Sequence, residues 1–135
     1  MRQQTPNIRI VAMAIATFMV AMASRSHAQA GIERKTLLQQ DLAIPGHETR
    51  LVEATLAAGA REGKHSHPGT LIVYILEGQL TFELAGMPTK TLKAGDSILV
   101  TPGQVHEGIN NGRVPVKLVA TFIVEKGKPL TTPAS

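Results

Sequence analysis

Turn-forming residues recur every eight to twelve positions through most of this chain, where they separate short apolar or alternating runs. Examples are TLIVYILEG at residues 70–78, QLTFELAG at residues 79–86 and DSILVTPG at residues 96–103. Runs rich in Val, Ile, Thr, Tyr and Phe at that spacing predict an antiparallel β-sandwich or β-barrel. From residue 31 onward no stretch keeps a helical period for three turns, so we expect an all-β fold. A chain of 135 residues has room for one ordinary domain.

The first 30 residues have the pattern of an export signal. Arg2 and Arg9 give a positive start without any acidic residue, residues 10–23 form an apolar run broken only by Thr17, and Ala28-Gln29-Ala30 is a small-x-small cleavage site. This 14-residue run is shorter than the ~20 residues that a membrane-spanning helix needs, which disfavours an uncleaved anchor. We therefore predict a signal peptide at residues 1–30, cleavage after Ala30, and a periplasmic or secreted protein without a stable membrane anchor.

Charge and cysteine content argue against a nucleic-acid-binding protein and against a fold stabilised by disulfide bonds. Removal of the signal takes away three arginines and no acid, which leaves 11 of the 14 basic side chains against 10 acidic ones. The high isoelectric point of 9.8 therefore owes much to the signal and does not indicate the basic stripe of a nucleic-acid-binding protein. The chain has no cysteine, so its stability must come from a packed core without disulfide bonds.

The composition divides the exported part into three segments: an N-terminal arm at residues 31–49, a β-barrel domain at residues 50–127 and a C-terminal tail at residues 128–135. Residues 31–46 combine charges with a Pro45-Gly46 turn signal and are interpreted as an entry arm and loop. His47, just after this turn, is expected in a solvent-exposed loop. The tail KPLTTPAS has the composition of a loosely ordered terminus.

Two histidines stand two positions apart at the start of an apolar strand, in KHSHPGTLIVYILEG at residues 64–78. Residues two apart on a strand point to the same face, so His65 and His67 can reach one metal ion. The following strand is apolar on both faces, and such a strand is normally covered on both. We therefore expect a homodimer in which the outward-facing residues meet a second subunit. By this alternation the inward set is Leu71, Val73 and Ile75, and the outward set is Ile72, Tyr74 and Leu76.

A third histidine, His106, follows the turn Thr101-Pro102-Gly103 at the end of another expected strand. Together these stretches resemble the two motifs of the cupin family, in the order in which the family has them. The resemblance implies a small single-domain cupin, which is an antiparallel jelly-roll β-barrel with a metal site in its interior. Residues that match the first motif are Gly59, His65, His67 and Gly78, and those that match the second are Gly95, Gly103, His106 and Asn110.

Two positions depart from the cupin pattern. Thr101 stands where the second motif usually has proline, a mild change because Pro102 still stiffens the turn. Leu71 stands where the first motif has the glutamate that holds the ion together with the histidines. The resemblance therefore carries over three metal ligands, His65, His67 and His106. We expect a divalent transition metal, iron, zinc, nickel, copper or manganese; loss of a carboxylate disfavours the hard ion manganese, whereas imidazole suits the others.

No nearby carboxylate clearly replaces the missing ligand. Glu62 and Glu107 are close to the histidines in sequence, but Glu107 should point to the opposite face of a regular strand from His106. We expect Asn110 and Asp96 to brace turns rather than contact a ligand.

Two classes of function stay open. One is a small metal-dependent enzyme of the dioxygenase kind, in which the ion polarises an oxygen-rich small molecule or binds dioxygen. The other is a non-catalytic cupin that binds a metal or a small ligand, in a metal-containing or metal-free pocket. Nothing in the sequence identifies a substrate, and one architecture hosts many functions.

Overall fold

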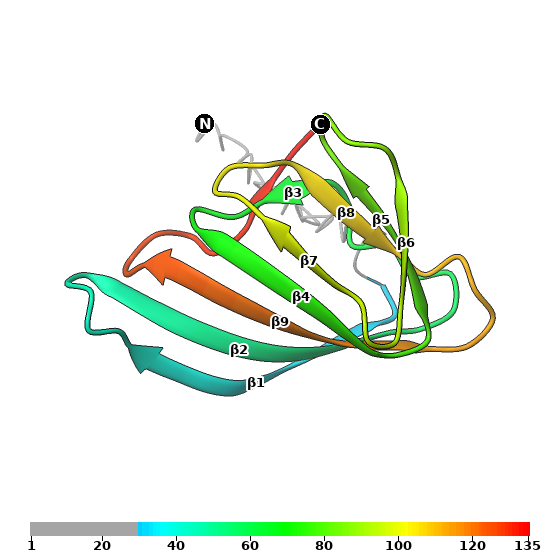
Figure 1. The fold of residues 1–135 in the computed structure, drawn as a ribbon, viewed down its shortest axis with the longest axis horizontal. Coiled ribbons are helices and arrows are strands. Elements are labelled where there is room, and N and C mark those ends of the chain that lie inside the picture. Colours follow the sequence, from blue (N-terminus) through cyan, green and yellow to red (C-terminus); the bar gives the residue numbers. More distant parts are fainter. Residues whose placement is uncertain (1–29) are drawn as a thin grey trace, which may run out of the picture.

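The computed structural model describes residues 30–135, which form two five-stranded antiparallel sheets packed face to face (Figure 1). The first sheet has the order β1 (Ile32–Asp41), β2 (His47–Leu56), β9 (Val116–Glu125), β4 (Thr70–Glu77) and β7 (Ser97–Val100). The second has the order β10 (Thr132–Pro133), β3 (His65–Ser66), β8 (His106–Ile109), β5 (Gln79–Leu84) and β6 (Lys90–Lys93). The predicted all-β antiparallel jelly roll is confirmed.

The predicted signal peptide falls, except for Ala30, outside the described residues. Within residues 30–135 no helix is long and apolar enough to cross a membrane.

The core lies between the two sheets and follows the predicted alternation. On β4 the inward set is nearly inaccessible, whereas Ile72, Tyr74 and Leu76 are 38%, 46% and 38% exposed on the outer face. The predicted inward set of β4 therefore faces the core, and the predicted outward set faces away from it. Strands β2 and β9 alternate in the same way, and β5 closes the core from the second sheet with Leu80 and Phe82.

The interpretation of residues 31–46 as an arm and loop is wrong for the first part of this segment. Ile32–Asp41 form the ten-residue strand β1. This strand is paired along its length with β2, from Ile32 opposite Leu56 to Asp41 opposite Glu48. All its residues except Ile32 are exposed, so the sequence contains no alternation that would reveal a strand. His47 is likewise the first residue of β2 rather than part of an exposed loop.

The tail also differs from the prediction of loose order. Thr132 and Pro133 form β10 opposite Ser66 and His65, and the Ala134 amide donates to the Lys64 carbonyl at 2.9 Å. Figure 1 shows this red segment running beside β3. Backbone pairing needs no particular side chains, which explains why composition did not predict it.

Two residues brace turns as predicted. Asn110 is fully buried, and its amide nitrogen donates to the carbonyls of Leu56, Ala57 and Val114 at 3.0, 3.1 and 2.8 Å. Its side-chain oxygen accepts from the Gly112 amide at 2.9 Å. The Asp96 carboxylate accepts from the Lys93 amide at 2.9 Å and closes the turn between β6 and β7. Buried polar groups that are satisfied in this way stabilise one loop geometry.

Candidate functional site

The three histidines predicted as ligands meet at one end of the space between the sheets. His65 on β3 stands directly opposite His106 on β8, and His67 follows β3 on the same face as His65. Their ring centroids lie 4.4 to 5.0 Å apart, and one nitrogen from each ring lies within 4.8 Å of the others. All three side chains are buried. The alternation of side chains along β3 and the pairing of β3 with β8 thus produce the cluster.

Backbone carbonyls fix the orientation of each ring. The Nδ1 atom of His65 lies 2.6 Å from the Gly63 carbonyl, that of His67 lies 2.7 Å from the Leu130 carbonyl, and that of His106 lies 3.0 Å from the Gln104 carbonyl. A carbonyl only accepts, so Nδ1 carries the proton in each ring and the lone pair resides on Nε2. The Nε2 atom of His106 is buried without a partner within the described part of the chain. This is the arrangement by which proteins orient metal-ligating histidines.

Burial also favours the neutral form, which a metal ligand must have, in two of the three rings. Burial lowers the pKa of His67 from 6.5 to about 4, although the Leu130 carbonyl partly opposes the shift. Burial likewise lowers the pKa of His106. Phe122 contacts His67 edge to face at 4.8 Å between centroids, and Phe82 stacks on His106 at 5.6 Å. Because a protonated imidazole cannot bind a metal, this apolar packing keeps His67 and His106 able to bind one at neutral pH.

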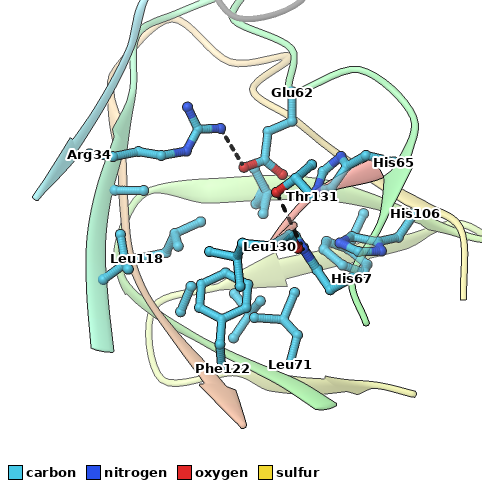
Figure 2. A pocket seen from close by; sticks show the side chains of 16 residues that line it. Arg34, Glu62, His65, His67, Leu71, His106, Leu118, Phe122, Leu130 and Thr131 are labelled. Carbon is cyan, nitrogen blue, oxygen red and sulfur yellow. Dashed lines mark hydrogen bonds and ion pairs between the residues drawn. The ribbon is translucent and has the colours of Figure 1, made fainter. Parts of the chain in front are cut away.

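A cavity of about 360 Å³ adjoins the histidines and lies between the sheets. Most of its wall is apolar, including Leu71, Leu118 and Phe122 (Figure 2). Leu71, at the position where the motif resemblance places a glutamate, is 3% exposed. The volume is in the range of small-molecule sites, and walls of this kind exclude water from a bound ligand.

The two carboxylates weighed in the sequence analysis have different positions. Glu107 points away from the histidines, as predicted: its two oxygens each accept from Arg61 at 3.0 Å, and one also accepts from the Gly63 amide at 3.2 Å. The hydrogen bonds from Arg61 hold the pKa of Glu107 below its usual value. Glu62 instead lines the cavity, beside His65 in Figure 2. It is the only carboxylate among the described lining residues.

Sequence reasoning missed other residues that line the cavity. Arg34 comes from β1, and Leu130 and Thr131 come from the tail, the two segments to which no strand had been assigned. The charge of Arg34 was visible in the sequence, but its direction depends on the pairing of β1 with β2. His47 is not part of the cluster, and its Nδ1 lies 3.0 Å from the Pro45 carbonyl.

A family model described as a cupin domain matches residues 52–128, which is more than half of the chain. The chain belongs to the cupin family. The resemblance inferred from the two motifs is therefore confirmed. This cupin is 34% identical over 87 residues to a germin-like protein, subfamily 2 member 2, of Arabidopsis thaliana. That match covers 58% of this chain and 40% of the relative, so the cupin spans less than half the length of that protein.

Solved structures show the same fold at low sequence identity. A cupin-like protein from Thermotoga maritima superposes with a TM-score of 0.62 and 21% identity, covering 77% of this chain and 76% of the other. The DMSP lyase DddQ from Ruegeria pomeroyi superposes with a TM-score of 0.58 and 21% identity, covering 64% of this chain and 43% of the other.

Proposed function

We propose that this cupin binds one divalent transition metal through His65, His67 and His106 and acts as a metal-dependent enzyme on a small organic molecule in the adjoining cavity. The observation that carries the proposal is the convergence of three buried imidazoles. Each is fixed through Nδ1 by a carbonyl, and one has an unpartnered Nε2. Three histidines with an open position form a recognised catalytic zinc arrangement, and imidazole also suits iron, copper and nickel.

A bound ion would supply Lewis-acid polarisation of an oxygen, or a site for dioxygen. The residues of the chain supply the remaining requirements. The apolar walls exclude water and burial keeps His67 and His106 uncharged, so charge on a bound molecule is weakly screened. Glu62, as the only carboxylate among the described lining residues, is the side chain best suited to accept a proton from a ligand. One solved relative in fold is an enzyme, the DMSP lyase, which supports a catalytic role for such a cavity.

The test is metal content by elemental analysis of the purified full chain, with binding measured by calorimetry after loading with zinc, iron or nickel. We expect about one ion per chain in the wild type and loss of most binding in His106→Ala. His47→Ala is the matched control, because this histidine lies on β2 outside the cluster and should leave binding intact. A wild type without metal under every loading condition would contradict the metal proposal.

A second candidate is a binding cupin without turnover, and the apolar character of the cavity favours it. The ring of His67 is strongly desolvated, and the wall is mainly aliphatic and aromatic, which suits a metal-free ligand pocket. Saturable binding of a small molecule to metal-free protein, with no product formed after metal loading, would support this candidate over the enzyme.

We further propose that the protein is exported and forms a homodimer. The export proposal rests on residues 1–30, and mass spectrometry of the protein recovered from its host should find a chain that begins at Gly31. The dimer proposal rests on the outer face of the first sheet, where Ile72, Tyr74 and Leu99 are exposed on the neighbouring strands β4 and β7. An apolar patch across paired strands is typical of an interface between subunits.

A further inference from the structure

Arg34 carries the only permanent positive charge among the described residues that line the cavity. On β1 it stands opposite Ala54 of β2, a buried residue that lines the same cavity. Directly opposed residues of an antiparallel pair share a face, so the pairing directs Arg34 inward although the strand is at the sheet edge. Figure 2 shows its guanidinium extending toward Glu62 across the cavity.

Glu62 is held in place by contacts with Gly108 that do not involve Arg34. Its Oε2 atom accepts from the Gly108 amide at 3.2 Å, and its own amide donates to the Gly108 carbonyl at 3.0 Å. A Cβ atom at position 108 would lie 2.6 Å from Oε2, so the carboxylate occupies space that exists only because residue 108 is glycine. Gly108 is not in the left-handed region, and its backbone therefore gives no separate reason for glycine.

The contact between Arg34 and Glu62 is weak. It consists of one pair of atoms, Nη2 and Oε1, at 3.5 Å, and the side chains are 39% and 16% exposed. By contrast, Arg61 holds Glu107 through two hydrogen bonds at 3.0 Å. A partly exposed, single-contact ion pair contributes little to stability. Arg34 can thus exchange Glu62 for another anion at small cost, while Glu62 keeps its bond to Gly108.

We propose that Arg34 is the anion-binding residue of the cavity and that the ligand is a small organic carboxylate with an apolar body. The carboxylate of the ligand replaces Glu62 as the partner of Arg34, because guanidinium and carboxylate form strong charge-assisted hydrogen bonds. The apolar body then packs against Leu118, Phe122 and Leu130. This proposal deepens the proposed function and rests on its small-molecule cavity, but Arg34 needs no metal to bind an anion.

The test compares benzoate with its neutral analogue benzamide, titrated into ¹⁵N-labelled full-length protein and followed by NMR. The wild type should bind benzoate about tenfold more tightly than benzamide, with shifts at Arg34 and Glu62. Arg34→Met should remove that preference. The control Lys35→Gln removes the same charge from the next, exposed position of β1 and should keep it. Glu62→Gln should strengthen benzoate binding severalfold, because the competing charge is gone.

The same titrations are run on protein as purified, on protein dialysed against a chelator and on zinc-loaded protein, each with its metal content measured. Benzoate selectivity that depends on Arg34 in metal-free protein supports this inference even where the metal proposal fails. Equal binding of benzoate and benzamide, no binding of either, weaker benzoate binding by Glu62→Gln, or equal effects of Arg34→Met and Lys35→Gln would overturn it, whatever the metal content. Arg34→Lys, which keeps the charge without the planar fork, should keep part of the preference and serves if Arg34→Met does not fold.

Discussion

Replacing Leu71 with glutamate should make the stability of this cupin depend on metal. Leu71 is 3% exposed and lines the cavity beside the histidines, so the introduced carboxylate would lie in the same space as the three imidazoles. At an effective dielectric constant of 20, two unit charges 4 Å apart attract by about 4 kcal/mol. Tenfold in affinity corresponds to about 1.4 kcal/mol. Leu71→Glu should therefore raise affinity for a hard ion such as manganese by about tenfold or more, after desolvation is subtracted.

Without metal the same substitution should destabilise the fold. It removes a buried leucine side chain and leaves an unpaired carboxylate in an apolar wall, a change that costs about 3 to 5 kcal/mol. Burial would raise the pKa of the introduced carboxyl, so the folded state would bind more protons than the unfolded state. The free energy of unfolding of the metal-free variant should therefore fall as the pH rises above about 4.3, the ordinary value for glutamate.

The assay is urea unfolding of the wild type and the variant at pH 5 and pH 7.5, each with a chelator and with excess manganese. We expect a large stability deficit in chelator at pH 7.5, a smaller one at pH 5, and recovery with manganese at pH 7.5. Thr70→Glu is the matched control, because it places the same group one residue along β4 on the other face, outside the proposed dimer patch, and should not change manganese affinity. Equal stability of Leu71→Glu with and without manganese, or equal manganese affinity in both variants, would refute the inward placement of a ligand at this position.

Three further outcomes follow from the described contacts. Because burial lowers the pKa of His67 to about 4, the unfolded state binds more protons below about 6.5, and metal-free protein should lose about 2 to 3 kcal/mol between pH 7 and pH 4 in denaturant titrations. Asn110→Ala removes four hydrogen bonds of a fully buried side chain and should cost about 3 kcal/mol or more, whereas Asn111→Ala, which removes one exposed bond to Thr81, should cost under about 1 kcal/mol by thermal unfolding. Ile72→Glu should convert a dimer into a monomer in light scattering at micromolar concentration; an unchanged mass would count against the proposed interface.

The sequence predicted those parts of the structure that depend on alternation along a strand. Leu71, Val73 and Ile75 could be placed inward because β4 has one consistent parity, and the same rule brought His65 and His67 to one face. The placement of Glu107 away from His106 followed from the same geometry. His106 could be added only through the motif resemblance, because the pairing of β3 with β8 joins residues about 40 positions apart.

The remaining parts of the site depend on pairing between strands that have no alternating pattern. Nearly every residue of β1 is exposed, so neither its strand nor the inward direction of Arg34 could be read from the sequence. The Leu130 carbonyl that orients His67 is a backbone group in the tail, 63 residues away, and any side chain at position 130 would offer the same carbonyl. Composition is therefore uninformative about both contacts.

The proposed metal site and the positive charge of the cavity come from different residues. His65 and His106 lie on β3 and β8, His67 follows β3, and backbone carbonyls orient all three rings, whereas the guanidinium of Arg34 comes from β1 at the edge of the other sheet. A change at position 34 alters the charge at one end of the cavity without moving a ligand of the metal. A change at position 71 alters the proposed metal site but leaves the positive charge of Arg34 in place. Under the two proposals, metal choice depends on the three histidines and position 71, and ligand choice depends on position 34.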